Sequence, residues 1–545
     1  MLEFARGPTR LPGRARPSPW AHRTRTGSPR ARQTVWCAVP SFLLDGRERR
    51  KVPFARYTNG RPNSTRIRAV GERLASKTLR NSALVVGARA VAKLAVFAVV
   101  VLLVRHLGDE RFGRFATMVV YVTLVGVVAD LGLQTVFIRD VSRDRGEFRR
   151  YLSNLVGTRF VLSVAALVLL AGALRLFTPV LFPYTIAAFV LLLTTSYSSL
   201  LRAVFYIRGR LIYEALAIIA EAILLLALTL VAISRGATWD VFLWVYSAGY
   251  LFTCLFAIAI IRWRWKERIE ARLDPAFVRH LLVAGVPLAL GFTITTIYAQ
   301  LDVVLLQVLK GFQMVGWYAA ANRFVDAVAW IPQSAMGAVF PALSLVAATE
   351  GRRLVFAYEK SFKMLAIIAL PLAVGIGVTA DSLVTLTFGH GFDQSIPALR
   401  ILAPSIALLF VNNAFIYTLT AINRQVDFTR LSLATLVVNI TLNLLLIPAY
   451  GYLGAAAAST LTEAALFAGG LWLLRRQLSP LRVMGSSGRV IVSAALMGAV
   501  LYPIRSWPLV VVVIVGAAVY VAALFALRAL NAEEWSIVRS GLMAR

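Results

Sequence analysis

Long apolar runs are the feature that most constrains the fold of this chain. About fourteen runs of roughly twenty apolar residues follow one another from residue 83 onward, and a helix of that length spans the approximately 30 Å of hydrocarbon in a bilayer. A mean hydropathy of +0.72 and a 59% share of hydrophobic residues exclude an ordinary soluble protein. The runs lack the ten-residue alternation of an outer-membrane barrel. The sequence therefore predicts an all-α polytopic membrane protein, with spans near residues 83–104, 115–136, 153–174, 179–200, 212–233, 241–262, 281–306, 316–340, 361–380, 397–420, 428–448, 452–474, 488–504 and 508–529.

Basic residues in the loops between these runs predict the orientation of the chain. Lys and Arg gather in every second loop, and the loops of membrane proteins that are rich in Lys and Arg face the cytoplasm. The basic residues of the rich loops include Arg143, Arg149, Arg202, Arg208, Arg210, Arg272 and Arg475. An even number of spans then places both termini in the cytoplasm. The apolar runs and the charged loops predict a multi-pass protein of the cytoplasmic membrane.

The first eighty residues differ from the rest of the chain. They lack an apolar period, are rich in Arg, Pro, Gly, Ser and Thr, and carry 19 Lys/Arg against 4 Asp/Glu. Such a segment cannot bury enough apolar surface to fold, so residues 1–80 are predicted to form a disordered basic extension. Its charge suits anionic lipid headgroups or nucleic acid. The alternative is a start site placed too early, with the true start near Val70, so that residues 1–69 are not expressed.

A polar turn occurs twice, each time after an apolar run. The stretches LGDERFGRFA and LKGFQMVGWYA share two glycines with four residues between them, and Gly108 and Gly113 precede Gly311 and Gly316 by the same 203 residues. An even number of spans separates the two turns, so both face the same side of the membrane. This arrangement predicts a parallel repeat with a pseudo-twofold axis along the membrane normal, as in transporters that rock two halves. Chance recurrence of a glycine-containing turn is the alternative.

The repeat predicts how the chain is divided. After the extension, residues 81–265 form a first bundle of six helices and residues 266–475 form a second bundle of six. Residues 476–545 add two further helices and a cytoplasmic tail.

Motifs of soluble enzymes are absent from the sequence. There is no phosphate loop and no dinucleotide-binding glycine motif. The 2 cysteines, Cys37 and Cys254, allow neither a disulfide framework nor a cysteine zinc site, and the 4 histidines lack the spacing of metal ligands. The sequence therefore predicts a protein that is not an enzyme and has no cofactor or metal.

Ionisable residues inside the apolar runs are the candidates for function, because a charge in hydrocarbon is costly. The basic ones are Arg89 and Lys93, spaced i, i+4 in the first run, Arg159 in the third, and Arg323 in the eighth with Asp326 beside it. If these cations face one cavity, the cavity attracts an anion, and the guanidinium fork matches phosphate. In the alternative interpretation Arg159 snorkels to the membrane interface, and Arg323 and Asp326 neutralise each other.

Acidic and amide side chains within the runs are sparser. The acids are Asp130, Glu214, Glu221, Asp302 and Glu463. Asn439 and Asn443 are interpreted as hydrogen-bonding residues between helices rather than as substrate contacts.

Several short motifs follow one another in a fixed order between residues 78 and 475. They are Leu107-Gly108 with Glu110, Phe112 and Gly113; Asp130-Leu-Gly-Leu133 followed by Arg139; Val315-Gly-Trp-Tyr-Ala-Ala320 with Arg323; Phe388-Gly389 before Pro397-Ala-Leu-Arg-Ile-Leu402; and Asn439-Ile-Thr-Leu-Asn443, Ile447-Pro448, Tyr450-Gly451 and Gly454-Ala-Ala-Ala457. In this order the chain resembles the polysaccharide flippases of the multidrug/oligosaccharidyl-lipid/polysaccharide exporter superfamily. The basic extension departs from that family.

The resemblance implies a two-bundle transporter of twelve or fourteen helices that turns a lipid-linked oligosaccharide across the cytoplasmic membrane by alternating access. The pyrophosphate of an undecaprenyl-diphosphate carrier would bind basic residues, the sugars would meet polar walls, and the polyprenyl tail would stay in lipid. The residues assigned to pyrophosphate are Arg89, Lys93, Arg323 and, more weakly, Arg159. Asp302 or Glu221 is assigned to a coupling proton or Na⁺.

The partners expected from the resemblance are the lipid-linked oligosaccharide, membrane lipids, and the polymerase and glycosyltransferases of surface polysaccharide synthesis, such as that of O-antigen or exopolysaccharide. No nucleic acid is expected. Two alternatives within membrane transport remain, a peptidoglycan lipid II flippase and a cation-coupled drug antiporter. The antiporter would show an acid-dominated cavity. A purely structural membrane protein would need none of the buried charges.

Overall fold

The computed structural model describes residues 64–267, 269–349, 351–422, 424–475 and 480–529. Within these ranges every regular element is a helix, which confirms the predicted all-α class. The described helices belong to one compact unit. Most of the predicted basic extension, residues 1–63, and the predicted cytoplasmic tail from residue 530 onward lie outside the described residues.

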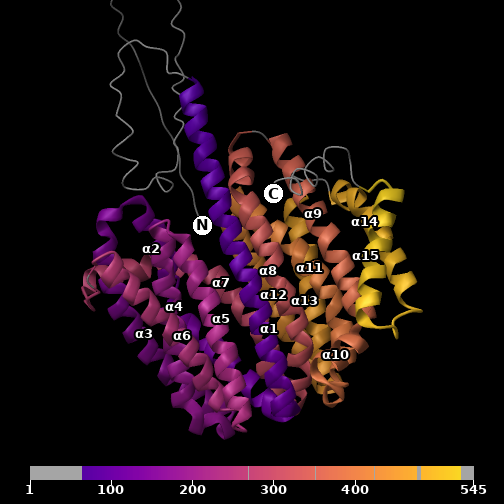
Figure 1. Ribbon diagram of the computed structural model, residues 1–545, viewed down its shortest axis with the longest axis horizontal. Coiled ribbons are helices and arrows are strands. Elements are labelled where there is room, and N and C mark those ends of the chain that lie inside the picture. The colour runs from indigo at the N-terminus through magenta and orange to yellow at the C-terminus, as the bar shows by residue number, and fades with distance from the viewer. Residues whose placement is uncertain (1–63, 268, 350, 423, 476–479, 530–545) are drawn as a thin grey trace, which may run out of the picture. The chain divides into compact units, whose positions relative to one another are not determined.

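Fifteen α-helices, with short 3₁₀ and π segments between some of them, make up the described chain (Figure 1). The first six are α1 (Ser64–Asp130), α2 (Leu133–Arg143), α3 (Phe148–Phe177), α4 (Thr185–Ile207), α5 (Leu211–Ser234) and α6 (Val241–Ala259). The next seven are α7 (Pro275–Lys310), α8 (Phe312–Thr349), α9 (Gly351–Val378), α10 (Ala380–Phe388), α11 (Ser395–Ala421), α12 (Gln425–Tyr450) and α13 (Tyr452–Leu474). The last two are α14 (Pro480–Leu501) and α15 (Leu509–Ala526).

Eleven helical stretches among the described residues are long and apolar enough to cross a membrane. The first, Gly87–Asp130, has 44 residues, and at 1.5 Å per residue its length of about 66 Å is twice the hydrocarbon thickness. Its helix is broken at Gly108, where φ is 71° and ψ is −178°, so it contains the first two predicted spans. The predicted count of fourteen spans counts this stretch twice and also includes α8 and α14. Exposed aliphatic and aromatic side chains, such as Val168, Leu176 and Ile514, form the surface that lipid covers.

Local sequence signals explain where α7 begins and ends. The Asp274 side chain accepts hydrogen bonds from the backbone N–H groups two and three residues later, at 3.1 and 3.3 Å, and Pro275 occupies the first helical position. The helix ends at Gly311, with φ at 88° and ψ at −179°. These torsion angles are close to those of Gly108, so the two turns that repeat in the sequence also share a backbone conformation.

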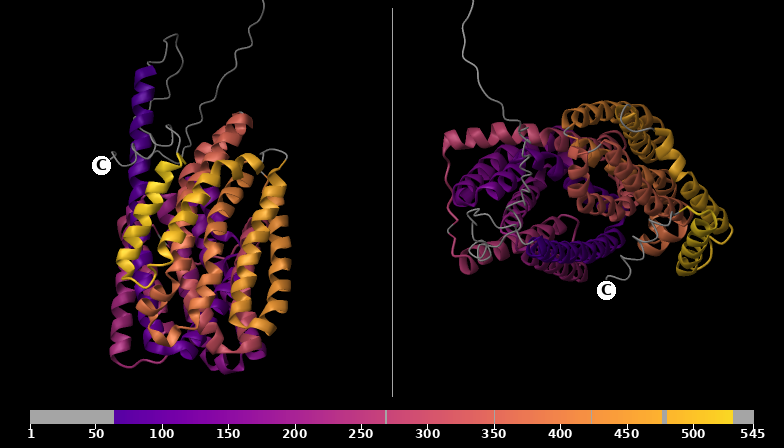
Figure 2. Two further views of the ribbon diagram at one scale, coloured as in Figure 1. Left: turned by 90° about the vertical axis from the view of Figure 1, so that its right-hand side faces the viewer. Right: turned by 90° about the horizontal axis from the view of Figure 1, so that it is seen from above.

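The packing of the helices joins the two halves of the chain through α1. This helix packs against both α5 and α8, while α11 lies among α8, α9 and α13. The two C-terminal helices pack on α9, where the Tyr520 hydroxyl donates to the Ile367 carbonyl at 2.8 Å, and they lie on the side of α9 that is remote from α3 to α6 (Figure 2). The division into bundles at residues 265 and 475 stays a prediction.

Candidate functional site

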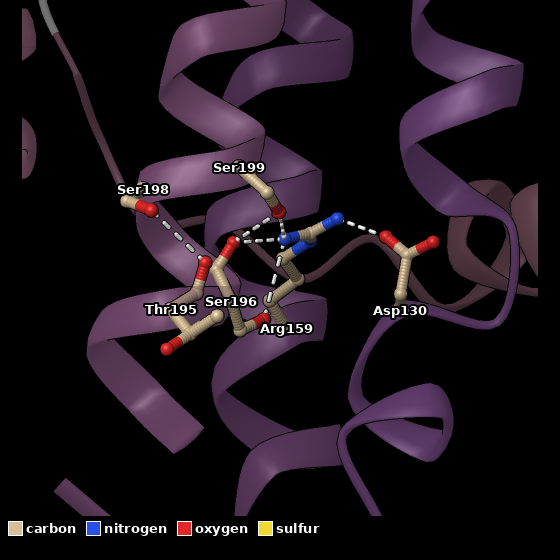
Figure 3. Close-up of polar contacts among 6 residues, drawn as sticks. All are labelled: Asp130, Arg159, Thr195, Ser196, Ser198 and Ser199. Atoms are coloured by element: carbon tan, nitrogen blue, oxygen red, sulfur yellow. Dashed lines mark hydrogen bonds and ion pairs between the residues drawn. The ribbon is translucent and has the colours of Figure 1, made fainter. Parts of the chain in front are cut away.

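Arg159 is fully enclosed by the protein. Its side chain, from α3, is 0% exposed and forms an ion pair with the Asp130 carboxylate at the end of α1. One guanidinium nitrogen, Nη1, also donates to the Ser196 carbonyl and to Ser199 Oγ, the latter at 3.0 Å, both on α4 (Figure 3). A buried guanidinium needs such a charge partner and such acceptors. Arg159 therefore does not snorkel, and its charge is already balanced within the protein.

Arg89 contacts α4 nearer its C-terminal end than Arg159 does, at Tyr206. Its guanidinium, on α1, donates to the Tyr206 hydroxyl, which in turn donates to Glu214 on α5 at 3.4 Å. The Arg89 side chain is exposed, whereas Glu214 is buried. This chain of contacts joins three helices.

Arg202 forms a third polar contact on α4 that the sequence interpretation missed. Its Nη1 lies 3.7 Å from the Glu221 carboxylate on α5, and Glu221 also accepts a hydrogen bond from the Thr253 hydroxyl on α6. The sequence interpretation placed Arg202 in a loop, but α4 continues to Ile207. The spacing of Ser196, Ser199, Arg202 and Tyr206, at i, i+3, i+6 and i+10, is the signal that would have placed them on one helical face.

Together these contacts form a polar stripe along α4, which we define as Ser196, Ser199, Arg202 and Tyr206. Its length from Ser196 to Tyr206 is about 15 Å, from a rise of 1.5 Å per residue. Three cations meet it, Arg89, Arg159 and its own Arg202, and three acids accompany them, Asp130, Glu214 and Glu221. The α4 polar stripe is therefore balanced in charge rather than purely cationic.

The two other predicted cations differ from each other. The Lys93 side chain is exposed, lies one turn from Arg89 on α1, and forms no hydrogen bond or ion pair with any described residue. Arg323, on α8, pairs with Asp326 at 3.1 Å, which is the mutual neutralisation considered above. Three of the four predicted cations, Arg89, Arg159 and Arg323, therefore already contact acceptors of the protein.

The second half of the chain holds a buried carboxylate with only neutral partners. Asp302, on α7, is 4% exposed. Its carboxylate accepts hydrogen bonds from the Tyr318 hydroxyl on α8, from Ser459 Oγ on α13 at 2.9 Å, and from the Val303 backbone N–H at 2.9 Å. Tyr318 and Ser459 were not identified from the sequence, since each is an ordinary polar residue in an apolar helix.

A second acid of this half, Glu463, also accepts a hydrogen bond from a neutral side chain. The Glu463 carboxylate on α13 accepts a hydrogen bond from Asn412 Nδ2 on α11 at 2.7 Å. Asn439 on α12 donates to Thr462 Oγ1 on α13 at 3.2 Å, which is the interhelical role expected of it. Among the described residues no Lys or Arg pairs with Asp302 or Glu463.

A small cavity of about 180 Å³ opens at the ends of α2 and α4. It is lined by Arg145, Arg149 and Arg208. Arg208 pairs with Glu267 at 2.5 Å and Arg149 pairs with Glu270 at 2.8 Å. The hydrogen bond from Arg149 lowers the pKa of the Glu270 carboxyl. The acids of the protein therefore already engage arginines of this cavity. In the part of the chain that the structure describes, no group of three or more His, Cys, Asp or Glu side chains is placed to hold a metal ion.

Comparison with known proteins finds relatives that are named as transporters or flippases. The family described as polysaccharide biosynthesis protein matches residues 78–347. A putative O-antigen transporter of Escherichia coli is 22% identical over 371 residues, which cover 66% of this chain and 88% of the relative. A probable low-salt glycan biosynthesis flippase of Haloferax volcanii is 27% identical over 168 residues, covering 31% of this chain and 36% of that protein.

Solved structures share the fold. The lipid II flippase MurJ in an inward closed conformation superposes with a TM-score of 0.68 at 13% sequence identity, covering 81% of this chain and 97% of that one. An inward-facing multidrug resistance MATE transporter superposes with a TM-score of 0.58 at 16% identity, covering 71% of this chain and 94% of that one. At these identities the likeness concerns the fold.

Proposed function

We propose that this chain, which belongs to the polysaccharide biosynthesis protein family and is a membrane transporter of that family rather than an enzyme, flips oligosaccharides linked to undecaprenyl diphosphate. The observation that carries the proposal is the pair of exposed cations on α1, Arg89 and Lys93. The helix that bears them packs against both α5 and α8, and thus against both halves of the chain. A pair of cations in an apolar helix is costly, and an anionic substrate explains why it is present.

The spacing of this pair suits a pyrophosphate. Arg89 and Lys93 are separated by about 6 Å along the helix axis, from a rise of 1.5 Å per residue, so two linked phosphates can contact both. Arg89 uses one guanidinium nitrogen for Tyr206, and a guanidinium has five N–H donors, so donors remain for the substrate. Lys93 has all its donors available among the described residues.

The other two predicted ligands have a smaller part in the proposal. Arg323 would reach a phosphate by exchanging Asp326 for it, since the pair is partly exposed to solvent. Arg159 is assigned last, because Asp130 and the serines of α4 already bind its guanidinium. Its contribution would be to position the α4 polar stripe that Arg89 also contacts.

Asp302 is the better candidate for ion coupling. A proton or Na⁺ bound there would balance a buried charge that only hydroxyl and backbone groups now stabilise. Glu221 is a weaker candidate, because Arg202 already balances part of its charge. Binding and release of the ion would bias the rocking of the two halves that moves the head group through the membrane.

In this proposal the arginine-rich ends of the helices face the cytoplasm of a bacterium, and both termini are cytoplasmic. The lipid-linked oligosaccharide arrives from glycosyltransferases on that side. A polymerase on the opposite side consumes the flipped product.

Export of surface glycan tests the proposal in a strain that lacks its own flippase. Arg89→Gln and Lys93→Gln should each insert at the level of the unchanged chain, because removing a charge from an apolar helix does not hinder insertion. Both should nevertheless abolish export, and lipid-linked repeat units should accumulate on the inner leaflet. Arg175→Gln is the control, since this exposed arginine at the end of α3 lies over the Phe182 ring and outside the polar stripe.

Normal export by both α1 variants would sink the anion-binding mechanism. A transport assay with the purified protein in liposomes distinguishes the alternative substrates. Transport of lipid II in preference to the oligosaccharide carrier would establish the peptidoglycan alternative, and proton-driven export of a cationic dye would establish the drug antiporter.

A further inference from the structure

Two glycines allow α1 and α8 to cross in direct backbone contact. A Cβ atom added at Gly113 would lie 1.9 Å from the carbonyl oxygen of Phe312, and one added at Gly316 would lie 2.0 Å from the carbonyl oxygen of Asp109. Real Cβ atoms essentially never approach other heavy atoms within 3.0 Å. Only glycine therefore fits at either position. Small residues at helix crossings bring backbones together in this way in membranes, where packing rather than hydrophobic burial drives association.

The crossing is reciprocal. The offset of 203 residues in the sequence relates Gly113 to Gly316 and also Asp109 to Phe312, so each half of the chain presents the same backbone surface to the other. Contacts in which position i meets j and j meets i surround a twofold axis. The crossing thus lies where the pseudo-twofold axis of the repeat leaves the molecule, beside the turns at Gly108 and Gly311.

The side chains around this crossing do not share its symmetry. The Asp109 carboxylate accepts hydrogen bonds across the crossing from Gln313 Nε2 at 2.8 Å and from Trp317 Nε1 at 3.1 Å. The residue equivalent to Asp109 in the second half is Phe312, whose side chain accepts no such bonds. One polar latch, formed by Asp109, Gln313 and Trp317, therefore joins two backbones that are otherwise held by close packing and by the contact of the Arg114 guanidinium with the Phe312 ring.

We propose that this glycine crossing closes the transport path at the Gly108 end, and that α1 and α8 separate there when the path opens to that side. The proposal rests on the transport function proposed above. Two halves that are related by a pseudo-twofold axis and rock against each other must part where they meet on that axis. The crossing suits such parting because it has no backbone hydrogen bond to break, and the latch can exchange its two hydrogen bonds for bonds to water.

Cross-linking across the crossing tests the proposal without any substrate. In a chain with Cys37→Ser and Cys254→Ser, cysteines at Arg114 and Phe312 report the distance between the helices, since the Arg114 guanidinium lies 5.7 Å from the Phe312 ring centre. A short bifunctional thiol reagent should join them rapidly in membrane vesicles. Adding Gly113→Ala or Gly316→Ala should slow the reaction at least about tenfold, which corresponds to about 1.4 kcal/mol against the closed state.

Gly126→Ala is the matched control for steric effects. Gly126 lies on the same helix, and a Cβ atom there would meet nothing within 4 Å, so the rate of cross-linking should not change. Rates equal to that of the unchanged chain in both Gly113→Ala and Gly316→Ala would overturn the proposal.

A second variant decides the matter if the alanine variants do not reach the membrane. Asp109→Ala removes the acceptor of both latch hydrogen bonds and leaves the glycine crossing free of added volume. It should slow cross-linking, whereas Glu110→Ala should not, because the Glu110 side chain has no partner on α8 among the described residues, and its partner on α1, Arg114, is already replaced by cysteine in this chain. An unchanged rate in Asp109→Ala would contradict the closure. Slowed cross-linking in a protein that exports no glycan would instead contradict the proposed substrate and leave the closure standing.

Discussion

The two halves of the chain stabilise their buried charges by opposite means. In the first half, cations and acids meet along the α4 polar stripe, and Arg159 and Arg202 each have an acidic partner. In the second half, Asp302 and Glu463 are surrounded by hydroxyl and amide donors, and no described basic residue pairs with either. A buried charge without a counter-ion is costly even when it accepts hydrogen bonds, and a mobile ion bound beside it would supply the missing charge.

Under the function proposed above, this difference separates charges that stabilise the fold from charges that couple transport to an ion gradient. In the ion pairs of the first half both charges belong to the protein, so removing one of them should mainly lower the free energy of unfolding. The acids of the second half lack a resident counter-charge, so their removal should be felt mainly as a loss of coupling. The following variants test this difference between the two halves.

The largest effect is expected for Arg159→Met. It leaves the Asp130 carboxylate without its buried partner, and because the Asp130 side chain is 38% exposed, the loss should be about 1.5–3 kcal/mol, the cost of hydrogen bonds to a charged group, rather than that of a fully buried pair. The free energy of unfolding should fall by that order in a denaturation experiment on the detergent-solubilised protein. The double variant Arg159→Met with Asp130→Asn should recover most of the loss. A double variant as unstable as the single one would show that the arginine acts through packing instead of charge.

Asp302→Asn should behave in the opposite way. The amide oxygen can still accept from Tyr318 and Ser459, while the Val303 N–H loses its acceptor, so removal of the uncompensated charge should leave the stability unchanged within about 1 kcal/mol. Transport in liposomes should lose its dependence on the proton or Na⁺ gradient. Glu221→Gln is the matched comparison from the first half and should lower the stability, because it leaves Arg202 without its acid. A destabilised Asp302→Asn that keeps its gradient dependence would remove the contrast between the halves.

Asn439→Ala should have a smaller effect. It removes the interhelical hydrogen bond to Thr462, and such bonds in membrane proteins contribute about 0.6 kcal/mol on average. Thr441→Ala, on the same helix, is the control, since its hydroxyl bonds only to the Val437 carbonyl of α12. Equal stabilities of the two variants would show that the asparagine does not hold α12 to α13.

The smallest effect is expected for a charge pair on α2, which belongs neither to the α4 polar stripe nor to the surroundings of Asp302 and Glu463. Arg139 donates to Asp140 at 2.7 Å, and this hydrogen bond holds the pKa of the Asp140 carboxyl below its usual value. A lowered pKa in the folded state adds stability at pH values above the ordinary aspartate pKa, and that stability is lost as the pH falls through the folded pKa.

Because the Arg139 side chain is 38% exposed, the contribution should be only about 0.2–1 kcal/mol. Unfolding measured at neutral pH and at about pH 3 should show Asp140→Asn less stable than the unchanged chain only at neutral pH. A difference that persists in acid would assign the effect to packing.

Several features of the protein follow from its sequence alone because they depend on residues close together in the chain. The apolar runs determined the helices and the membrane class, since the length of a run and the thickness of the bilayer are both known. The pair of Arg323 and Asp326 lies within one helical turn, and the repeated turn carries its own glycines. The family could also be recognised from short motifs in order.

Other features were decided only by the tertiary structure. Arg159 meets Asp130 across 29 residues, Arg89 meets Tyr206 across 117, and Asp302 meets Ser459 across 157. The helical period places polar residues on one face, but it does not tell which helix that face will meet. The same holds for the glycine crossing, where the sequence showed the repeat and only the packing of α1 on α8 brought Gly113 and Gly316 together. Counter-charges and close approaches of this kind depend on how the helices pack. For this reason the interpretation of the cations as one anion-binding site did not identify Asp130 as the partner of Arg159.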